Sequence, residues 1–391
     1  MNVAFPANRN TTPAARGARA RLRVAFGPVT PGWGSWEWVG ADLQRELAGC
    51  FDSARFGWNE FPECDVAVIV KHLPPAEAIE RLARRAAVVY APVDAYGSQA
   101  EIAADATGLR RCARIVVHCE RLRPYFEPFA PVTYMDHHLK FASREMAVYP
   151  SESERGFILW AGVRSNLPPL VEWVNRYGLD LPLVVLTNLE QEARSGGGRE
   201  QVIGDREQGL AGGAERGQVL DDREQGRVGP RSGRGSVPTR SVGTSGEKMG
   251  ADVGRELAAM FGFAAGGDVR VENWSARRQR ELTATAMAAI DIKGDDFRAR
   301  HKPPAKAIDF IASGLPLAMN DSSGAEHLAR IGFDVASPLD APRWFSRAYR
   351  EETVAFGRTL RERLSLRMVG MRWSRLVEEV GSGERGEEVM G

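Results

Sequence analysis

The segment 298–316 contains the residues of this 391-residue chain that are best suited to bind a charged ligand. It begins with four basic residues, Arg298, Arg300, His301 and Lys302. Pro303 and Pro304 follow, and proline is favoured at the first positions of a helix. A helix start attracts anions because its free N–H groups and its dipole present positive charge. The basic residues and the helix start together suit a diphosphate.

Two further residues of this segment, Lys306 and Asp309, lie on the same predicted helix. Asp309, two turns from the helix start, can accept hydrogen bonds from hydroxyl groups such as those of a ribose. A second interpretation fits the local chemistry equally well: the basic residues form a solvated rim, and Asp309 is a surface carboxylate with Lys306 three residues before it. The residues alone leave both interpretations open.

Asp94 is the candidate for the chemical step. It follows the predicted strand at 87–91, and open α/β sheets bind their ligands at the carboxyl ends of the strands. A carboxylate there can act as a general base on an acceptor hydroxyl, or it can bind that hydroxyl. An aspartate that caps a turn or a helix is the alternative.

Three residues of the loop after the first predicted strand, Gly32, Gly34 and Ser35, are candidates for contact with a phosphate or an acceptor. Glycine lets the backbone approach a ligand closely, although a tight turn explains the same residues. Ser35 is also the expected N-cap of the following helix. His137 and His138, near the end of the first half, are expected to line a cleft. Adjacent side chains on an extended chain point in different directions, so a shared metal is not expected.

Short apolar runs alternate with helical patterns along the chain, which indicates an α/β protein with parallel sheets. Residues 21–145 are predicted to form a first Rossmann-like, doubly wound domain, with strands at 22–27, 65–70, 87–91 and 114–118. Residues 151–341 are predicted to form a second one, with strands at 157–162, 183–186, 269–271, 288–292 and 315–319.

Other segments lie outside these predicted cores. Residues 1–20 and 381–391 are predicted tails, and 342–380 are predicted helices that pack back across the domains. Residues 191–250 interrupt the second domain, and 15 of these 60 residues are glycine while none is aromatic. Such a segment cannot build a core. We therefore expect a disordered Gly/Arg-rich insertion there.

The composition is that of an ordinary soluble globular protein. The 52 Lys+Arg nearly balance the 51 Asp+Glu, for a formal net charge of +1, so no global field favours nucleic acid or an anionic membrane. The four cysteines lack zinc-ligand spacing and are expected to be reduced core thiols. The sequence shows no apolar run of membrane-spanning length and no signal peptide, which favours the cytoplasm.

A family resemblance lies in residues 306–316, whose sequence is KAIDFIASGLP. This run resembles the K-x-x-E-Y-x-A-x-G-x-P signature of GT-B glycosyltransferases of the glycosyl transferases group 1 family. The resemblance implies that Asp309 holds the ribose of a nucleotide-sugar donor. The run Gly162-Val163-Arg164, at the end of a predicted strand, is similar to the family's strand-to-loop Gly-Arg. This likeness implies a donor-phosphate contact for Arg164, which otherwise caps the loop after that strand. His301 stands where the family often has a second acid, which leaves that contact to the donor sugar unassigned.

The resemblance implies a glycosyltransferase of the hexosyltransferase type that takes a nucleotide diphosphate sugar as co-substrate. The second domain then holds the donor, and the first domain holds the acceptor, which is a glycan, a lipid-linked molecule or a small molecule. Basic residues and helix starts stabilise the diphosphate as it leaves, so neither a metal nor a cofactor is required. The family implies retention of the anomeric configuration, whereas Asp94 as a base suits inversion.

Two other functions remain compatible with the sequence. A sugar-nucleotide epimerase uses the same architecture and nucleotide site. A catalytically inactive nucleotide-sugar-binding protein fits the histidine at position 301 and the long insertion. A nicotinamide-dependent dehydrogenase is disfavoured, because neither domain's first strand is followed by a glycine fingerprint and an acid about 20 residues later.

Overall fold

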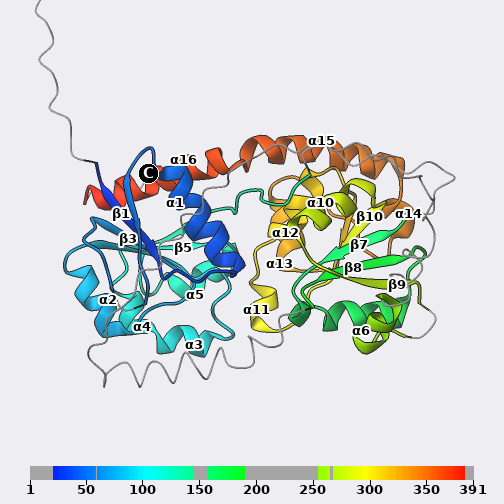
Figure 1. Ribbon diagram of the computed structural model, residues 1–391, viewed down its shortest axis with the longest axis horizontal. Helices are drawn as coiled ribbons and strands as arrows, with labels where there is room; N and C mark the ends of the chain where they lie inside the picture. Colours follow the sequence, from blue (N-terminus) through cyan, green and yellow to red (C-terminus); the bar gives the residue numbers. More distant parts are fainter. Residues whose placement is uncertain (1–20, 59, 144–155, 190–253, 265–266, 384–391) are drawn as a thin grey trace, which may run out of the picture. The chain divides into compact units, whose positions relative to one another are not determined.

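The computed structural model describes residues 21–58, 60–143, 156–189, 254–264 and 267–383. The predicted tail 1–20 and the predicted insertion 191–250 lie outside the described residues, as does most of the predicted tail 381–391. The chain divides into two compact units, each built around one sheet with helices against it (Figure 1). The first unit contains the described residues up to His118, Leu122–Asp136 and the residues from Leu366 onward, and the second contains Cys119–Arg121 and His137–Ser365.

The sheet of the first unit has six parallel strands in the order β2-β1-β3-β4-β5-β6. The strands are β1 (Arg23–Gly27), β2 (Asp52–Arg55), β3 (Val66–Val70), β4 (Ala87–Ala91), β5 (Arg114–Val117) and β6 (Val132–Tyr134). The central strand β3 is buried along its whole length. An apolar run of this kind is typical of a parallel strand that is covered on both faces.

The helices of the first unit connect these strands. They are η1 (Trp36–Ala41), α1 (Asp42–Leu47), α2 (Ala76–Ala83), α3 (Gln99–Ala104), α4 (Ala106–Leu109), α5 (Arg123–Phe126) and α16 (Leu366–Gly381), and the short turn η2 (Glu120–Leu122) precedes α5. The first helical segment, η1 with α1, buries four apolar side chains: Trp36, Val39, Leu43 and Leu47.

Helix α16 supplies part of the first unit's core, although it follows the whole second unit in sequence. It packs against α1 and β3. Its buried side chains join the cluster formed by β1 and β3, and they are Val369, Trp373, Leu376 and Val377. At its end, a Cβ on Gly381 would lie 3.1 Å from side-chain atoms of Leu22 and of Val66. The beginning and the end of the described chain therefore meet in one unit.

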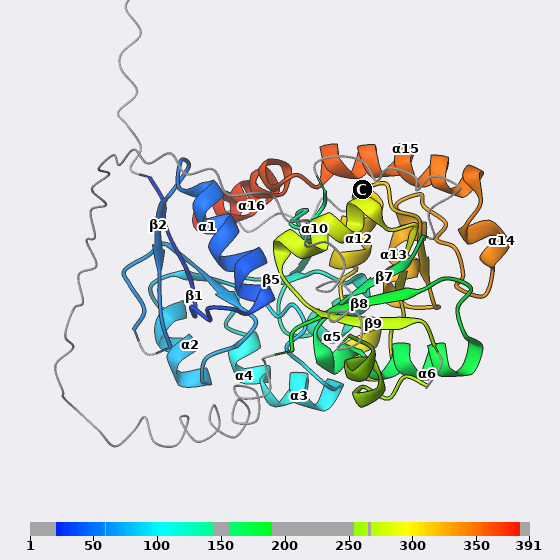
Figure 2. The same cartoon turned by 45° about the vertical axis from the view of Figure 1, so that its right-hand side comes forward.

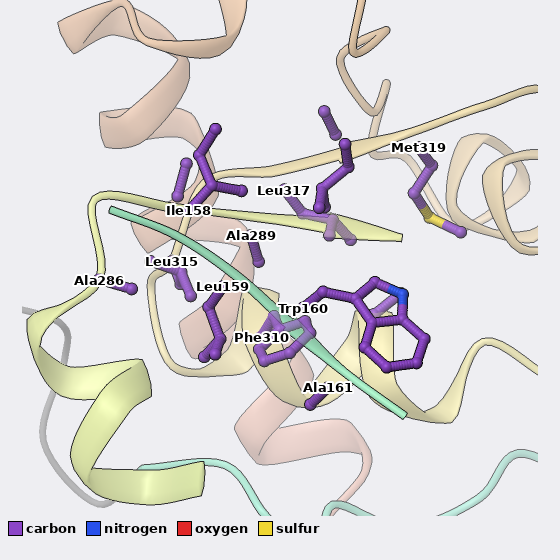
Figure 3. Close-up of a cluster of buried hydrophobic side chains, with 14 of the residues drawn as sticks. Ile158, Leu159, Trp160, Ala161, Ala286, Ala289, Phe310, Leu315, Leu317 and Met319 are labelled. Atoms are coloured by element: carbon purple, nitrogen blue, oxygen red, sulfur yellow. The ribbon is translucent and has the colours of Figure 1, made fainter. Parts of the chain in front are cut away.

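The sheet of the second unit has five parallel strands in the order β11-β10-β7-β8-β9. Figure 2 shows its neighbouring strands β7, β8 and β9. The strands are β7 (Ile158–Ala161), β8 (Leu183–Thr187), β9 (Val269–Asn273), β10 (Ala288–Asp291) and β11 (Leu317–Met319). Figure 3 shows the core beside β7 and β10, where Leu159 and Ala289 lie near Phe310 of α12.

The helices of the second unit begin at recognisable signals. They are η3 (Arg164–Asn166), α6 (Pro168–Tyr177), a helix at 254–260, α10 (Ala276–Thr285), α11 (Phe297–Arg300), α12 (Ala305–Ala312), α13 (Ser323–Arg330), α14 (Ala341–Trp344) and α15 (Arg347–Arg363). Ser275, Ser322 and Ser346 cap α10, α13 and α15 by accepting a hydrogen bond from a first-turn N–H group, which satisfies a donor that the helix leaves without a partner.

Helix α15 packs directly on α12. The contact is close at Gly357, where a Cβ would lie 2.2 Å from the carbonyl oxygen of Ile311. Only glycine allows this approach of the two backbones. Gly314, with φ 73°, ends α12 in a left-handed conformation that glycine adopts without strain.

The predicted α/β class with two Rossmann-like domains is confirmed. The edge strands β2 and β6 are not among the predicted ones. Ser35 is not an N-cap, since its φ of −58° and ψ of −43° are helical and its side chain makes no capping bond. All four cysteines are free, but Cys50 is exposed rather than buried. Within the described residues, no helix is long and apolar enough to cross a membrane.

Candidate functional site

The carboxyl ends of the five parallel strands of the second unit meet at one edge of the sheet, and polar residues gather there. Lys293 follows β10, and Asn320 follows β11. These two residues are joined by two hydrogen bonds, from Lys293 N–H to Asn320 Oδ1 at 2.9 Å and from Asn320 Nδ2 to the Lys293 carbonyl at 2.8 Å. The pair fixes the loop that follows β10, next to the start of α12. This is the edge at which doubly wound sheets bind ligands.

Three lysines, Lys293, Lys302 and Lys306, are concentrated at this edge, and we call them the lysine cluster. The whole chain has only six lysines among 52 basic residues. Lys302 Nζ donates to Asn166 Oδ1 in the turn after β7, at 3.2 Å. Lys293 Nζ lies 2.9 Å from Asp291 Oδ1. Lysine presents a compact charge whose pKa responds strongly to its surroundings, unlike arginine.

Lys306 lies in the first turn of α12, and among the described residues its ammonium has no hydrogen-bond or ion-pair partner. The ammonium lies over the ring of Trp160, 5.8 Å from the centroid. Burial, followed by the charges of Lys302 and Lys293, lowers the pKa of Lys306 to about 7, against the opposing effects of Asp291 and Asp309. A cation in this situation is stabilised by an anion that enters the cluster.

Trp160 lies near the carboxyl end of β7, beside Ala161 (Figure 3). Its ring occupies the space beside Gly162, where a Cβ would lie 2.2 Å from the indole. The buried Trp160 Nε1 and Asp291 Oδ2 have no hydrogen-bond partner among the residues that the structure describes. Buried polar atoms of this kind are rare in folded proteins, and each one calls for an explanation such as a ligand.

The predicted basic residues before α12 differ in their placement. Lys302 and Lys306 belong to the lysine cluster, whereas Arg298 and Arg300 are exposed on the short helix α11. His301 is buried, and its Nδ1 lies 2.6 Å from the Phe297 carbonyl. Its ring is tilted by 35° against that of Phe297, with 4.1 Å between the two centroids. Burial lowers the pKa of His301. A neutral, packed imidazole is therefore the state this environment favours.

Arg164, predicted to contact donor phosphates, lies in the turn η3 after β7. Its guanidinium lies over the ring of Phe261, 4.8 Å from the centroid. The turn also contains Asn166, which accepts the hydrogen bond from Lys302. The structure therefore brings the turn to the lysine cluster through Asn166, while the guanidinium of Arg164 lies against an aromatic ring.

Asp309 does not have the surroundings that a ribose contact requires. It is 2% exposed, and its two carboxylate oxygens accept the backbone N–H groups of Lys140 at 3.0 Å and Phe141 at 3.2 Å. Burial raises the pKa of Asp309 to about 7, while these backbone donors oppose the shift. The predicted ribose role is thus not supported, because this carboxylate anchors residues 140–141 on α12. Ser313 Oγ continues the anchor by accepting Ser143 N–H at 2.8 Å.

The two predicted histidines, His137 and His138, are 8% and 5% exposed. They begin the second unit rather than end the first, because the division falls between Asp136 and His137, nine residues before the predicted boundary at 145. No group of three or more histidine, cysteine or acidic side chains in the described part of the chain could hold a metal ion.

Asp94 lies at the carboxyl edge of the first unit's sheet, in the turn after β4. Its Oδ1 lies 2.8 Å from Lys71 Nζ, and Lys71 directly follows the neighbouring strand β3. Gly32 has a φ of 80°, a conformation in which L side chains are strained, so a turn requires glycine there. Gly34 and Ser35 belong to the first helical turn that follows.

Comparison with solved structures found similar chains. Sucrose-phosphate synthase from Thermosynechococcus elongatus covers 93% of this chain and 100% of its own length, with 9% identity and a TM-score of 0.56. An E. coli trehalose-6-phosphate protein bound with UDP-2-fluoro glucose covers 91% and 99%, with 8% identity and a TM-score of 0.55. The α,α-trehalose 6-phosphate synthase from Burkholderia multivorans covers 93% and 97%, with 10% identity and a TM-score of 0.52.

No model of a protein family matches the chain, and no curated protein matches it either. The similar structures are GT-B glycosyltransferases. With the two parallel sheets, they show that this chain has the GT-B fold. Its expected fold class is confirmed at this level.

Sequence reasoning missed three residues of these edges. Asn320 follows β11 directly, Lys71 follows β3 directly, and Lys293 comes two positions after the end of β10. A search for polar residues after every buried strand finds all three, because the carboxyl ends of parallel strands share one edge. The pairing of Lys71 with Asp94 needed the sheet order as well.

Proposed function

We propose that this protein transfers a sugar from a nucleotide diphosphate sugar to an acceptor hydroxyl, and that the lysine cluster binds the diphosphate. The observation that carries the proposal is Lys306 at the start of α12, whose ammonium has no ion-pair partner in the described part of the chain and lies near two further ammonium groups. Such an arrangement is costly in the free protein and becomes favourable when a polyanion binds.

The same groups supply the chemistry of the transfer step. Negative charge grows on the diphosphate as the bond to the sugar breaks, and cations fixed in advance stabilise that charge. Lys306 and Lys302 lie beside the N-terminus of α12, whose dipole acts in the same direction. We therefore propose a transfer that needs no metal ion.

Two further observations support this proposal. A structure of the same fold contains UDP-2-fluoro glucose, a nucleotide sugar. Trp160 Nε1, which no described residue engages in a hydrogen bond, lies beside the lysine cluster and offers a donor to a ligand oxygen. In the first unit, Asp94 is the group proposed to bind the acceptor hydroxyl, through the carboxylate that Lys71 fixes in place.

The test measures nucleotide binding by calorimetry and thermal shift with UDP, GDP, ADP, TDP and their common sugars, because a ligand of the native state raises its stability. The variants are Lys302→Gln and Lys306→Gln, and Arg358→Gln on the exposed face of α15 removes a positive charge elsewhere in the second unit. We expect one base to be preferred, and each lysine variant to weaken binding about tenfold or more, as loss of a charged contact does.

Retained affinity in both lysine variants would refute the assignment of the site, and binding of no nucleotide would refute the function. A nucleotide-sugar-binding protein without transfer activity is the second candidate, because Asp309 is engaged by the backbone at 140–141. Tight binding of one nucleotide sugar without release of free nucleotide, across a panel of acceptors, would favour that candidate.

A further inference from the structure

The first unit presents aromatic side chains at the carboxyl edge of its sheet, apart from any group the proposed donor site uses. Four neighbouring strands, in the order β2-β1-β3-β4, each contribute to this edge. The contributing residues follow those strands in turn, and they are Trp58, Trp33, Lys71 with His72, and Asp94. Residues far apart in sequence are thus gathered by the sheet order alone.

Trp33, Trp58 and His72 form what we call the aromatic platform. The ring centroids of Trp33 and His72 are 5.3 Å apart with an interplanar angle of 81°, and those of Trp58 and His72 are 5.6 Å apart at 47°. Trp33 is 47% exposed and Trp58 is 38% exposed. Two indoles that share a neighbour and stay open to solvent are unlike a packed core, and they offer ring faces to a ligand.

A polar pair borders the aromatic platform. Lys71 Nζ lies 4.9 Å from the centroid of the Trp33 ring and 2.8 Å from Asp94 Oδ1. The side chains of Lys71 and Asp94 are 15% and 21% exposed, so the pair is largely desolvated yet reachable. Because each charge is balanced by the other, the pair offers hydrogen-bond donors and acceptors without a net charge.

The backbone that positions this pair is strained. Lys71 has a φ of 65° and Val93, in the turn before Asp94, has a φ of 55°. A positive φ is a genuine outlier for a β-branched residue such as valine. The strained turn is held in place, since Lys71 N–H donates to the Ala91 carbonyl at 2.8 Å and the Tyr90 hydroxyl donates to the Lys71 carbonyl at 2.8 Å. Strain of this kind is retained where a site needs a fixed geometry.

We infer that the aromatic platform binds a neutral saccharide ring, which is the acceptor of the proposed transfer. A sugar ring has an apolar face of C–H groups, which packs on an indole, and a rim of hydroxyls, which bond to a carboxylate and an ammonium. The platform and the Lys71–Asp94 pair provide these two surfaces side by side. Only the role of this saccharide as the acceptor rests on the proposed function. The binding of the saccharide itself involves the first unit alone.

Other occupants fit less well. An anionic sugar needs a cation with unbalanced charge, and Lys71 is balanced by Asp94. A lipid chain needs a continuous apolar surface, which the charged pair interrupts. A nucleobase would also stack on the indoles, so the experiment must distinguish nucleobase binding from saccharide binding.

The test uses saturation-transfer difference NMR on the full-length protein with the methyl glycosides of glucose, galactose, mannose and rhamnose. Glucose 6-phosphate, adenosine and octyl alcohol are the competing chemistries. We expect at least one neutral glycoside to bind, with the strongest saturation on the C–H protons of one ring face. Trp33→Ala and Trp58→Ala should each weaken that binding about fivefold, as the loss of an aromatic contact does.

Three controls make the result decisive. Trp33→Phe keeps a ring and should restore most of the binding, whereas Tyr177→Ala removes an equally exposed ring from the second unit and should change nothing. Nucleotide affinity, measured on the same samples, should not change in the tryptophan variants. Binding of no glycoside, equal binding by wild type and both Trp→Ala variants, or preference for adenosine or glucose 6-phosphate would each overturn the inference. Because nucleotide affinity is measured separately, failure here is distinguishable from failure of the proposed donor site.

Discussion

Lys306 shows how a single side chain can be unfavourable in the free protein and useful in the complex. Its ammonium is partly buried near Lys293 and Lys302, and its pKa falls to about 7. A bound diphosphate would reverse the effect, since negative charge favours the protonated form. Binding and protonation at this residue are therefore coupled.

This coupling predicts a pH dependence of nucleotide-sugar affinity. Below pH 7 Lys306 is already protonated, so affinity is constant. Above pH 7 a proton must be taken up on binding, and affinity falls by up to about tenfold per pH unit. Calorimetry at pH 8 in two buffers of different ionisation enthalpy counts the protons that are taken up.

Lys306→Arg is the matched variant for this measurement, because arginine stays charged throughout the range. We expect its affinity to be flat between pH 7 and 9. Identical binding enthalpies in the two buffers for the wild-type protein would rule out the coupling.

At the scale of elements, the position of the lysine cluster depends on how closely α15 packs on α12. The first turn of α12 contains Lys306, and the body of the helix rests on α15 at Gly357. The opposite side of α12 holds residues 140–141 through Asp309. The helix is thus fixed from two directions before any ligand binds, which is the preorganisation that a binding site requires.

Gly357→Ala should destabilise the protein by about 2 kcal/mol, because the added methyl group would lie 2.2 Å from the Ile311 carbonyl oxygen and overpack the contact. Helix propensity alone predicts the opposite sign, a gain of about 1 kcal/mol. Chemical denaturation measures the difference. Gly49→Ala, with no atom within 4 Å of the added Cβ, is the control, and a stabilised Gly357→Ala protein would contradict the close contact.

At the scale of the whole molecule, the first of the two units of the GT-B fold is made from three stretches of chain. The first unit is completed by α16, whose buried residues lie in the same cluster as β1 and β3. The second unit is built from a nearly continuous stretch. We therefore expect each unit to have its own free energy of local unfolding. A core mutation in one unit should lower the stability of that unit and leave the other unchanged.

Trp373→Ala on α16 tests this division. Trp373 is 1% exposed, and its truncation should destabilise the first unit by about 3–5 kcal/mol. Hydrogen exchange should speed up for amides of β1 and β3 and stay unchanged for β7 and β8. Met371→Ala on the same helix removes a side chain that is 44% exposed and should leave both units unaffected; equal acceleration in the two units would contradict the assignment of α16.

Sequence patterns predicted the buried strands well because those strands are apolar along their whole length. They missed β2, whose sequence is DSAR, since an edge strand that is mostly exposed has no apolar signal. Lys302 was predicted from its position before a helix, and Lys306 from its position at the start of that helix. The role of Asp309 was not, because its partners Lys140 and Phe141 are 169 and 168 residues away. A family signature predicts which residue type stands at position 309. The contacts of that residue depend on how the chain packs around it.

The place of α16 in the first unit also has a consequence for biosynthesis. The ribosome makes β1 and β3 early, but it adds Trp373 only after all of residues 137–365. During synthesis, the first sheet therefore keeps an apolar surface exposed until α16 is made. By that point the strands β7 to β11 of the second unit have all been synthesised. We expect the unit that is translated later to be the first to reach its final structure, and the nascent chain to depend on chaperones until its last helix emerges.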